Sequence, residues 1–430
     1  MLTMSTRLKE LARQDKDIKV AIVGAGKMGK GLINQMSRIR GMMPSVVVNR
    51  NVSKAVDAFL SAGIRREDIV VSNSLKKVNF YLEKGKYIAT EDMDIATKAN
   101  IIEAVVDATG VPEVGAKVSL DSIENRKHII MLNVEADSVV GPILYNKAEE
   151  AGVVYTGTAG DEPGAVMELY DFAVGLGFQV LAIGKGKNNP LDMEATPDTV
   201  YERAIKNELN PHMLAGFVDG TNTMIEMTVM ANATGFVPDK RGGHGVTCSV
   251  DDLTKIFRLK EEGGVLNKYQ IVDYVMGIAP GVFVIFTTKL EEVHKQLEYL
   301  NMGPGPNYVL YRPYHLTSLE TPITIFNACY YKEATIAPVE GQVAETITVA
   351  KRDLKVGESL DRIGGYTVYG SIEEHRIAKE KNLVPIGLID ENTKVIKDIK
   401  KGEPISYDMI ELDKSKTIYK LRKLQDEIMG

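Results

Sequence analysis

The chain contains 430 residues with a net charge of −6; 44% of the residues are hydrophobic and 26% are charged. Because a single hydrophobic core rarely grows beyond about 250 to 300 residues, this length predicts two or three folded domains. The composition excludes a mainly disordered chain, and no apolar run approaches the roughly 20 residues that span a bilayer, so we expect a cytoplasmic protein without membrane contact. The negative charge gives no general attraction to nucleic acids, and any anionic ligand therefore needs a local cationic site.

The two cysteines, Cys248 and Cys329, lie far apart and belong to no CxxC motif or Cys/His cluster. We therefore expect neither a disulfide framework nor a zinc site. The first residues read as a charged helix that lacks the apolar segment of a secretion signal.

The segment from Lys19 to Arg50 predicts one βαβ unit, because an apolar strand, a glycine turn, an amphipathic helix and a second strand follow one another. The turn has the pattern GxGxxG. Its first glycine allows a tight bend, the second lets a pyrophosphate approach the backbone, and the third lets the helix pack on the strand. The turn predicts a nicotinamide dinucleotide site formed by Gly24, Gly26, Lys27, Met28 and Gly29.

The end of the second strand predicts which dinucleotide is bound. NAD-specific domains usually place an acidic residue here, about 20 residues beyond the last glycine, to bind the ribose 2′-hydroxyl. Asn49 and Arg50 stand there instead. Arg50 can pair with a 2′-phosphate and Asn49 can donate to it, which favours NADP(H). The alternative is that Arg50 is an ordinary solvated arginine.

Two more strands of this domain, at residues 101–110 and 128–135, end in polar residues. Ligands of open α/β sheets lie beyond the carboxyl ends of the strands. The candidates to line the nicotinamide side are therefore Thr109, Gly110, Asn133 and Glu135. A further strand at 152–156 leads into a glycine- and proline-rich segment, so we place the end of a Rossmann domain with a parallel sheet at residue 160.

Residues 161–340 predict an α+β substrate domain, in which a first candidate cluster is Lys185 and Lys187. These lysines follow the apolar strand from Val180 to Ile183 in a glycine-flanked turn. An ammonium group at this place can reach a substrate phosphate or carboxylate. The alternative is that both lysines only solvate a turn.

The second cluster begins at Asp219 and leads into a helix. Asn222 and Glu226 share one face of that helix because they lie four residues apart. We regard Asp219, Asn222 and Glu226 as catalytic candidates, with helix capping as the alternative explanation for Asp219.

The third cluster contains Arg312, Tyr314 and His315, with His244 as a companion from a glycine-rich loop. Arg312 offers a bidentate clamp for an anion, and either histidine can transfer a proton near neutral pH. The loop around His244 is rich in glycine and charge, which is typical of a mobile lid.

Residues 341–430 predict a small β-rich module followed by a helix at 414–429. Two segments, 353–360 and 398–405, repeat the pattern D-[LI]-K-x-G-E-x-[LI]. This module resembles the SAF domain family, and we interpret it as a substrate lid, an assembly surface or a scaffold.

Over nearly its full length the sequence resembles homoserine-dehydrogenase-like proteins with a C-terminal SAF domain, through the motifs GAGKMG, DATGVP, NVEAD, GDEPG, FVDGTNTMIEM and YRPYHLTSLE. Some members of that group are 1-deoxy-D-xylulose 5-phosphate reductoisomerase-like enzymes, which reduce a rearranged sugar phosphate with NADPH on the route to isoprenoid precursors. The resemblance implies a central catalytic and dimerisation domain, hence a homo-oligomer. Asn222 and Glu226 stand where homoserine dehydrogenases have a catalytic aspartate and lysine, so homoserine oxidation is not expected.

These features together favour an NADPH-dependent oxidoreductase that reduces a carbonyl in a small anionic, phosphorylated substrate. Lys185, Lys187 and Arg312 would bind the anion, and a histidine or a lysine would protonate the product oxygen. A bound divalent metal is a second way to polarise the carbonyl, but no motif indicates one. The alternatives are a sugar-acid, hydroxy-acid or homoserine-type dehydrogenase, and a non-catalytic regulator that responds to NADP(H).

Overall fold

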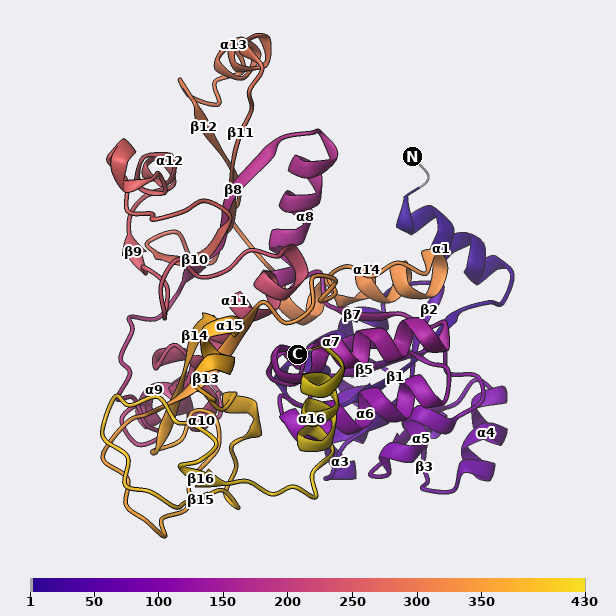
Figure 1. The fold of residues 1–430 in the computed structure, drawn as a ribbon. Helices are drawn as coiled ribbons and strands as arrows, with labels where there is room; N and C mark the ends of the chain where they lie inside the picture. Colours follow the sequence, from indigo (N-terminus) through magenta and orange to yellow (C-terminus); the bar gives the residue numbers. More distant parts are fainter. Residues whose placement is uncertain (1–2, 430) are drawn as a thin grey trace. The chain divides into compact units, whose positions relative to one another are not determined.

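The computed structural model describes residues 3–429, which form two compact units (Figure 1). Unit 1 comprises the chain up to Gly164 together with Leu316–Ala337, and unit 2 comprises Ala165–His315 and the chain from Pro338 on. The segments 161–340 and 341–430, expected as separate domains, thus both contribute to unit 2, and their independent folding stays a prediction. Within residues 3–429, no helix combines the length and the apolar character that a membrane crossing requires.

Unit 1 contains a seven-stranded sheet in which every recorded strand pairing is parallel, in the order β3-β4-β2-β1-β5-β6-β7. Its strands are β1 (Ile18–Val23), β2 (Met42–Val48), β3 (Ile69–Val71), β4 (Tyr87–Thr90), β5 (Ala104–Asp107), β6 (His128–Met131) and β7 (Tyr155–Gly157). The strand order reverses at β1, which creates the crevice in which doubly wound sheets bind ligands. The expected parallel α/β sheet is confirmed.

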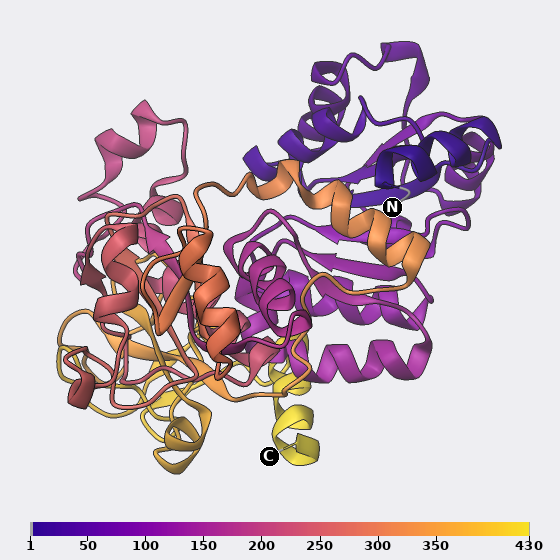
Figure 2. The ribbon, with the colours of Figure 1, turned by 90° about the horizontal axis from the view of Figure 1, so that it is seen from above.

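Helices cover both faces of this sheet, so its central strands are buried on both sides and read as nearly continuous apolar runs (Figure 2). The helices of unit 1 are α1 (Met4–Arg13), α2 (Lys27–Met36), α3 (Val52–Ser61), α4 (Leu75–Glu83), α5 (Met93–Lys98), α6 (Pro112–Glu124), α7 (Val134–Ala151) and α14 (Thr321–Phe326).

The segment 316–337 returns to unit 1 after a long excursion of the chain, and it lies along the unit in Figure 2. Its Ile325 and Phe326 are buried in the same apolar cluster as β1 and α2. A backbone hydrogen bond holds the start of this segment on unit 1, because Thr317 N donates to Gly160 O at 2.7 Å. A Cβ at Gly160 would lie 2.0 Å from Thr317 O, so no larger residue fits there.

Unit 2 is built on a five-stranded mixed sheet in the order β12-β11-β8-β10-β9. Its strands are β8 (Gln179–Lys187), β9 (Val246–Thr247), β10 (Ile271–Met276), β11 (Val282–Thr287) and β12 (Asn307–Arg312). Strands β8, β10 and β9 are parallel, whereas β11 runs antiparallel to β8 and β12. The helices of this part are α8 (Glu162–Gly175), which enters from unit 1, α9 (Tyr201–Lys206), α10 (Pro211–Val218), α11 (Thr221–Thr234), α12 (Leu253–Ile256) and α13 (Glu291–Tyr299).

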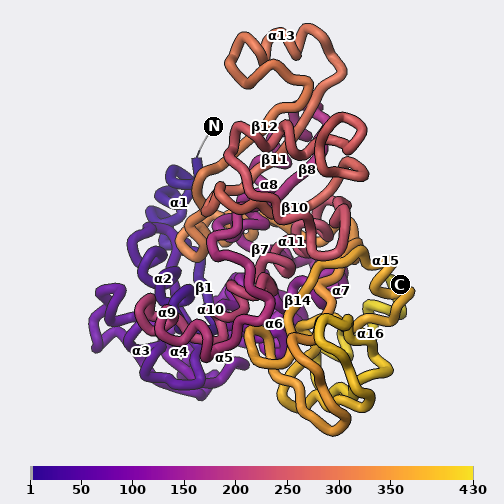
Figure 3. Tube along the Cα trace, turned by 90° about the vertical axis from the view of Figure 1, so that its left-hand side faces the viewer, coloured from indigo at the N-terminus to yellow at the C-terminus, as the bar shows by residue number. Residues whose placement is uncertain are grey.

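Helix α11 is the central element of unit 2. It contacts β10 and also β13 (Ala344–Ala350) and β14 (Val368–Glu374), an antiparallel pair from the C-terminal part. All of its residues except Asn222 are buried, as expected for a helix that is enclosed on every side. Helix α13, by contrast, stands at the tip of the β11–β12 hairpin (Figure 3).

The C-terminal part continues with short strands and ends in the helix expected from the sequence, which is confirmed. Its remaining elements are α15 (His375–Glu380), β15 (Lys394–Val395), β16 (Ile410–Glu411) and α16 (Thr417–Met429). The expected α+β and β-rich character of unit 2 is thereby confirmed.

The two repeated segments pair with each other around an approximate twofold relation. Asp353 accepts a hydrogen bond from Lys401 N at 2.9 Å, and Asp398 accepts one from Val356 N at 3.1 Å. The two contacts are equivalent, because the donor lies three residues beyond the aspartate of the other repeat. The aspartate of each repeat therefore links the two repeats through a hydrogen bond to the backbone of the other.

The glutamate of the motif acts within its own repeat. Glu358 accepts from Lys355 N at 2.7 Å, and Glu403 accepts from Lys400 N at 2.9 Å. Each glutamate thus closes the turn that its glycine allows through a positive φ. The aspartate and the glutamate of the motif thus both have a structural role.

Candidate functional site

The glycine turn of unit 1 has the geometry that a dinucleotide requires. Gly24 has a φ of 104°, and a Cβ there would lie 2.7 Å from Ala108 O. At Gly29 an added Cβ would lie 1.9 Å from Gly24 O, so the third glycine permits close helix–strand packing. At Gly26, the N-cap of α2, an added Cβ would meet no atom within 4 Å. That open space at a helix N-terminus fits a pyrophosphate.

Asn49 and Arg50 have different surroundings at the end of β2. Asn49 Oδ1 accepts from Ala25 N at 3.1 Å, and its Nδ2 donates to Asn51 O at 2.9 Å. The side chain of Asn49 therefore holds the glycine turn, and its expected role as a phosphate donor would require breaking this bond. Arg50 is exposed and has no ion pair within residues 3–429.

A buried polar network lies beyond β5. Asp107 Oδ1 accepts from Thr109 Oγ1 at 2.7 Å, and Asp107 Oδ2 accepts from Asn133 Nδ2 at 2.8 Å. Burial raises the pKa of Asp107, which these two donors oppose. Asn133 also caps α7 by accepting from Ala136 N at 3.2 Å. Both candidates thus shape the crevice, and Asp107, which the sequence analysis did not single out, connects them.

The other candidates of unit 1 lie at its loop ends. Lys27 and Met28 open α2, and Gly110 is exposed with a φ of 62°. The expected strand at 128–135 is shorter in the structure, because β6 ends at Met131, and Glu135 lies beyond it in the first turn of α7; its place beside the nicotinamide stays a prediction. A carboxylate in the first helical turn is favoured by the helix dipole.

Lys185 and Lys187 belong to strand β8 and not to a turn, which corrects the sequence interpretation. The glycines beside them allow neighbouring backbone to come close: a Cβ at Gly184 would lie 2.1 Å from Asp273 O, and one at Gly186 would lie 2.5 Å from Ala279 N. Because the two lysines are two residues apart in a strand, their side chains lie on the same face. Both lysines are buried, each 4% exposed.

The two lysines have unequal partners in unit 2. Lys185 forms a buried ion pair with Glu226 of α11. Lys187 Nζ donates to Phe217 O, at the end of α10, at 2.7 Å, and Lys187 has no ion pair within residues 3–429. Burial, and next the charge of Lys185, lower the pKa of Lys187 to about 8. Lys187 is therefore a cation that can release its proton near neutral pH.

Asp219 lies at the corner between α10 and α11 and forms a second buried ion pair. Its Oδ2 is 2.8 Å from Lys351 Nζ, and its Oδ1 accepts from Thr221 N at 2.9 Å. Burial raises the pKa of Asp219, and Lys351 opposes that shift. Lys351 was missed by the sequence analysis, because it lies in the C-terminal part, where no cluster of reactive residues was apparent.

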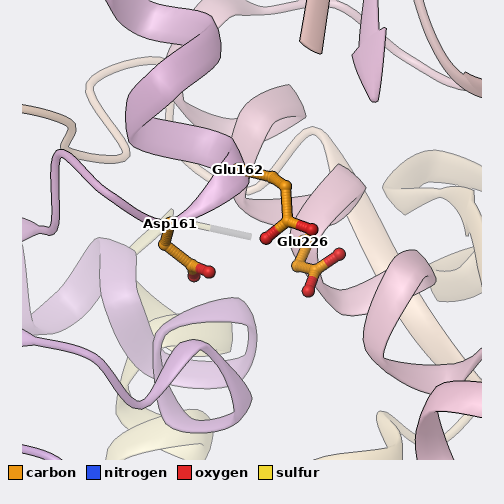
Figure 4. A group of neighbouring side chains, drawn as sticks. All are labelled: Asp161, Glu162 and Glu226. Carbon is orange, nitrogen blue, oxygen red and sulfur yellow. The ribbon is translucent and has the colours of Figure 1, made fainter. Parts of the chain in front are cut away.

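The remaining members of the second cluster lie on α11 and at the start of α8. Asn222 and Glu226 are one turn apart on α11, as expected, and Asn222 Oδ1 is 2.7 Å from where a Cβ at Gly216 would stand. Figure 4 draws Glu226 on α11, and it also labels Glu162, the first residue of α8, and Asp161 directly before it.

Comparison with known proteins assigns a class to the middle of the chain. Residues 160–321 match the family model described as the catalytic domain of oxidoreductase DRL. The sequence has no match among curated proteins. Similar solved structures include a protein of Thermotoga maritima described as a probable dehydrogenase, with 12% identity and a TM-score of 0.42 over 74% of this chain and 90% of that chain. Another is scyllo-inositol dehydrogenase from Lactobacillus casei with bound NAD(H) and scyllo-inositol, with 14% identity and a TM-score of 0.37 over 64% of this chain and 74% of that chain.

The matched catalytic domain contains Lys185, Lys187 and Glu226, and it follows a parallel sheet with a dinucleotide turn. The chain is an NAD(P)-dependent oxidoreductase.

The loop around His244 in this oxidoreductase is held in place by several hydrogen bonds. His244 Nε2 lies 2.7 Å from Asp239 Oδ2, and His244 N donates to Asp273 at 2.9 Å. Arg241 Nε donates to Glu373 of β14 at 2.8 Å. These bonds anchor the loop to β10 and β14, so the expectation of a mobile lid has no support in its contacts.

Arg312, Tyr314 and His315 lie at the end of β12 in the same unit of the oxidoreductase. Arg312 Nη1 is 2.8 Å from Glu168 Oε2, and its guanidinium stacks on the Tyr314 ring at 4.7 Å. Arg312 therefore already has an acidic partner. Tyr314 is exposed, and His315 is half-buried at the last residue of this stretch of unit 2.

Proposed function

We propose that the protein reduces a carbonyl group of a small anionic substrate with NADPH. The observation that carries this proposal is the pair of buried lysines on β8, of which Lys185 pairs with Glu226 whereas Lys187 has no ion pair within residues 3–429. A buried cation without a counter-ion is costly unless an opposite charge joins it. A phosphate or carboxylate group of the substrate supplies that charge to Lys187.

The same residues account for proton transfer. When bound, the dinucleotide supplies a hydride to the carbonyl carbon. Lys187, whose pKa of about 8 reflects burial and the charge of Lys185, gives its Nζ proton to the oxygen, so that the carbonyl becomes an alcohol. Lys185, held by Glu226, stabilises the negative charge that develops on this oxygen.

The preference for NADPH rests on Arg50. No acidic residue stands at the end of β2 to repel a 2′-phosphate, and the exposed guanidinium can form a bidentate pair with it. We expect Arg50→Asp to lower the affinity ratio of NADPH to NADH by at least about tenfold, measured by nucleotide fluorescence titration. Lys54→Asp, at an exposed lysine on α3, is the matched control. An unchanged ratio in Arg50→Asp would overturn the preference.

For the substrate we propose a phosphorylated sugar derivative of the 1-deoxy-D-xylulose 5-phosphate type. The resemblance to reductoisomerase-like enzymes supports this class, and the match to an oxidoreductase catalytic domain supports the redox chemistry. A divalent metal that polarises the carbonyl remains part of the hypothesis, and a chelator such as EDTA tests it.

The deciding assay follows NADPH absorbance with deoxyxylulose phosphate, aspartate semialdehyde and an unphosphorylated polyol in parallel. Turnover of the sugar phosphate supports the proposal, whereas turnover of the semialdehyde alone would indicate a homoserine-type enzyme. Turnover of the polyol alone would indicate a sugar dehydrogenase.

The lysine assignment has its own test. Lys187→Met should lower kcat by about 100-fold or more, because it removes both the proton donor and an anion contact. Lys379→Met, at an exposed lysine of the same unit, is the control and should keep full activity. If Lys187→Met retains the parent kcat, Lys187 is not the donor.

A further inference from the structure

A buried lysine from the C-terminal part lies in the same unit as the proposed reaction centre. Lys351 follows β13, and only 3% of its side chain is exposed. Its Nζ is 2.8 Å from Asp219 Oδ2 and donates to Ala195 O at 2.6 Å and to Gly365 O at 2.8 Å. Two of these partners are carbonyl oxygens that accept hydrogen bonds, and the third is a carboxylate at ion-pair distance. Lys351 is therefore held as a fixed, charged group.

The partner of Lys351 defines the corner between α10 and α11. Asp219 accepts from Thr221 N, and Thr221 Oγ1 in turn accepts from Gly370 N of β14 at 2.8 Å. Lys351, directly after β13, and Gly370 of β14 thus both hold the corner. Gly220, between Asp219 and Thr221, has a φ of 90°, so this tight bend depends on fixed neighbours.

This corner sets the positions of the groups that hold the two active-site lysines. Phe217, two residues before Asp219, supplies the carbonyl that accepts from Lys187. Glu226, on the helix that begins at the corner, pairs with Lys185. A shift of the corner therefore moves both lysines relative to a bound substrate.

We propose that Lys351, acting through Asp219, is a positioning residue of the active site. The C-terminal β-rich part thereby becomes a component of the catalytic machinery, and not only a lid, an assembly surface or a scaffold. This inference rests on the proposed function of Lys187. It does not require Lys351 to touch the substrate.

The charges around Lys187 give the inference a measurable signature. Lys185 and Arg203 lower the pKa of Lys187, while Glu226 and Asp219 raise it. If Lys351 is replaced by methionine, the buried Asp219 loses its cation and takes up a proton, because burial already raises its pKa. Lys187 then loses the influence of a negative charge, and its pKa falls.

Lys351→Met is the first variant for the experiment. We expect kcat to fall about 10- to 100-fold, since small displacements of reacting groups have effects of this size. The high-pH limb of the kcat profile should move to lower pH, and KM for NADPH should stay unchanged. Asp219→Asn should act in the same direction, and Lys351→Arg should restore part of kcat.

Two further measurements keep the test decisive. In the double variant Lys351→Met/Asp219→Asn no buried charge is left unpaired, so it should fold and be no less active than either single variant. Titration of ¹³Cε-lysine-labelled full-length protein with bound NADPH reports the Lys187 pKa without any substrate. The Lys187 resonance is assigned through Lys187→Met.

The outcomes separate this inference from the proposed function. A folded Lys351→Met or double variant in which neither the Lys187 pKa nor kcat changes overturns the inference, as does a loss of kcat with an unmoved Lys187 pKa. A lowered Lys187 pKa in a protein that turns over no carbonyl substrate supports the positioning role of Lys351 and overturns the proposed function alone.

Discussion

At the scale of single residues, the partners of the buried lysines distinguish those that are paired with a carboxylate from the one that we propose as proton donor. Lys351 and Asp219 neutralise each other, as Lys185 and Glu226 do, whereas Lys187 binds a backbone carbonyl and has no ion pair within residues 3–429. The sequence showed Lys185 and Lys187 because they stand two residues apart in a short glycine-flanked motif. It did not show the pair of Asp219 and Lys351, because the two residues meet only through the packing of α11 between two sheets.

A buried carboxyl group in unit 1 gives a prediction about pH. Asp137 of α7 accepts from Tyr155 Oη at 2.6 Å, and burial raises its pKa to about 6 from an ordinary value of 3.8. Since the folded state binds this proton more tightly, the group stabilises the fold below about pH 4, and that contribution is lost as the pH rises through 6.

We therefore compare the unfolding free energy of Asp137→Asn with that of the parent at pH 4 and at pH 8, by urea denaturation. The variant's value relative to the parent should rise by about 2 kcal/mol from pH 4 to pH 8. The amide keeps an acceptor for Tyr155 but has no charge to bury. Asp57→Asn on α3 removes an exposed charge and serves as the control. A stability difference that is the same at both pH values would show that Asp137 does not titrate in this way.

The glycine turn yields a second residue prediction from two neighbouring positions. Gly26→Ala should weaken NADPH binding at unchanged stability, because the added Cβ enters the open space where the pyrophosphate is expected. Gly29→Ala should lower the unfolding free energy by about 1 to 3 kcal/mol, since its Cβ overlaps Gly24 O. Nucleotide fluorescence and urea denaturation measure the two effects. Equal NADPH affinity in the parent and Gly26→Ala would argue against the site.

At the scale of elements, local constraints were predicted well and strand contacts were not. The GxGxxG turn was predicted because each glycine is required within one βαβ unit. Gly184 and Gly186 suggested a turn. In the structure they allow the backbone of Asp273 and of Ala279 to pack closely against strand β8. No local pattern distinguishes these two uses of glycine.

The repeated motif of the C-terminal part gives a prediction based on symmetry. Hydrogen bonding to Lys401 N lowers the pKa of Asp353, and hydrogen bonding to Lys355 lowers that of Asp398. Both carboxylates therefore stabilise the fold at neutral pH, and this contribution is lost on acidification below their ordinary range. Asp353→Ala and Asp398→Ala should lower the Tm at pH 7 by similar amounts in calorimetry.

The control for this prediction is Glu380→Ala, an exposed acid of α15. A Tm that falls in only one of the two aspartate variants would show that the repeats are not equivalent. An equal effect in the control would show that the loss reflects net charge.

At the scale of the whole molecule, unit 1 is discontinuous in sequence, because the chain leaves it at Gly164 and returns for Leu316–Ala337. The Rossmann part was predicted as residues 1–160 from its strands and turn. The return was not predicted, because its helix α14 has no motif and reveals its place only through the burial of Ile325 and Phe326 in the sheet's core.

This discontinuity predicts how fragments behave. A fragment of residues 1–164 should bind the dye ANS and melt without cooperativity, because it lacks apolar side chains that complete its core. Joining 1–164 to 316–337 through a short glycine–serine linker should give a cooperative Tm, since Thr317 N and Gly160 O are only 2.7 Å apart.

The linked fragment has a matched control in Phe326→Ala. Removing this buried ring should cost about 3 to 5 kcal/mol and restore much of the dye binding. If the fragment 1–164 alone melts as cooperatively as the linked one, the returning segment is not part of the core.

The return of the chain also bears on how the protein folds during synthesis. A ribosome adds roughly 5 to 20 residues per second, so about 10 to 35 seconds pass between the emergence of Gly164 and that of Ala337. During this interval the nascent Rossmann sheet lacks Ile325 and Phe326 and presents the surface that they cover. Unit 1 begins before unit 2 in the chain, yet its core is completed only after the first segment of unit 2, Ala165–His315, has been made.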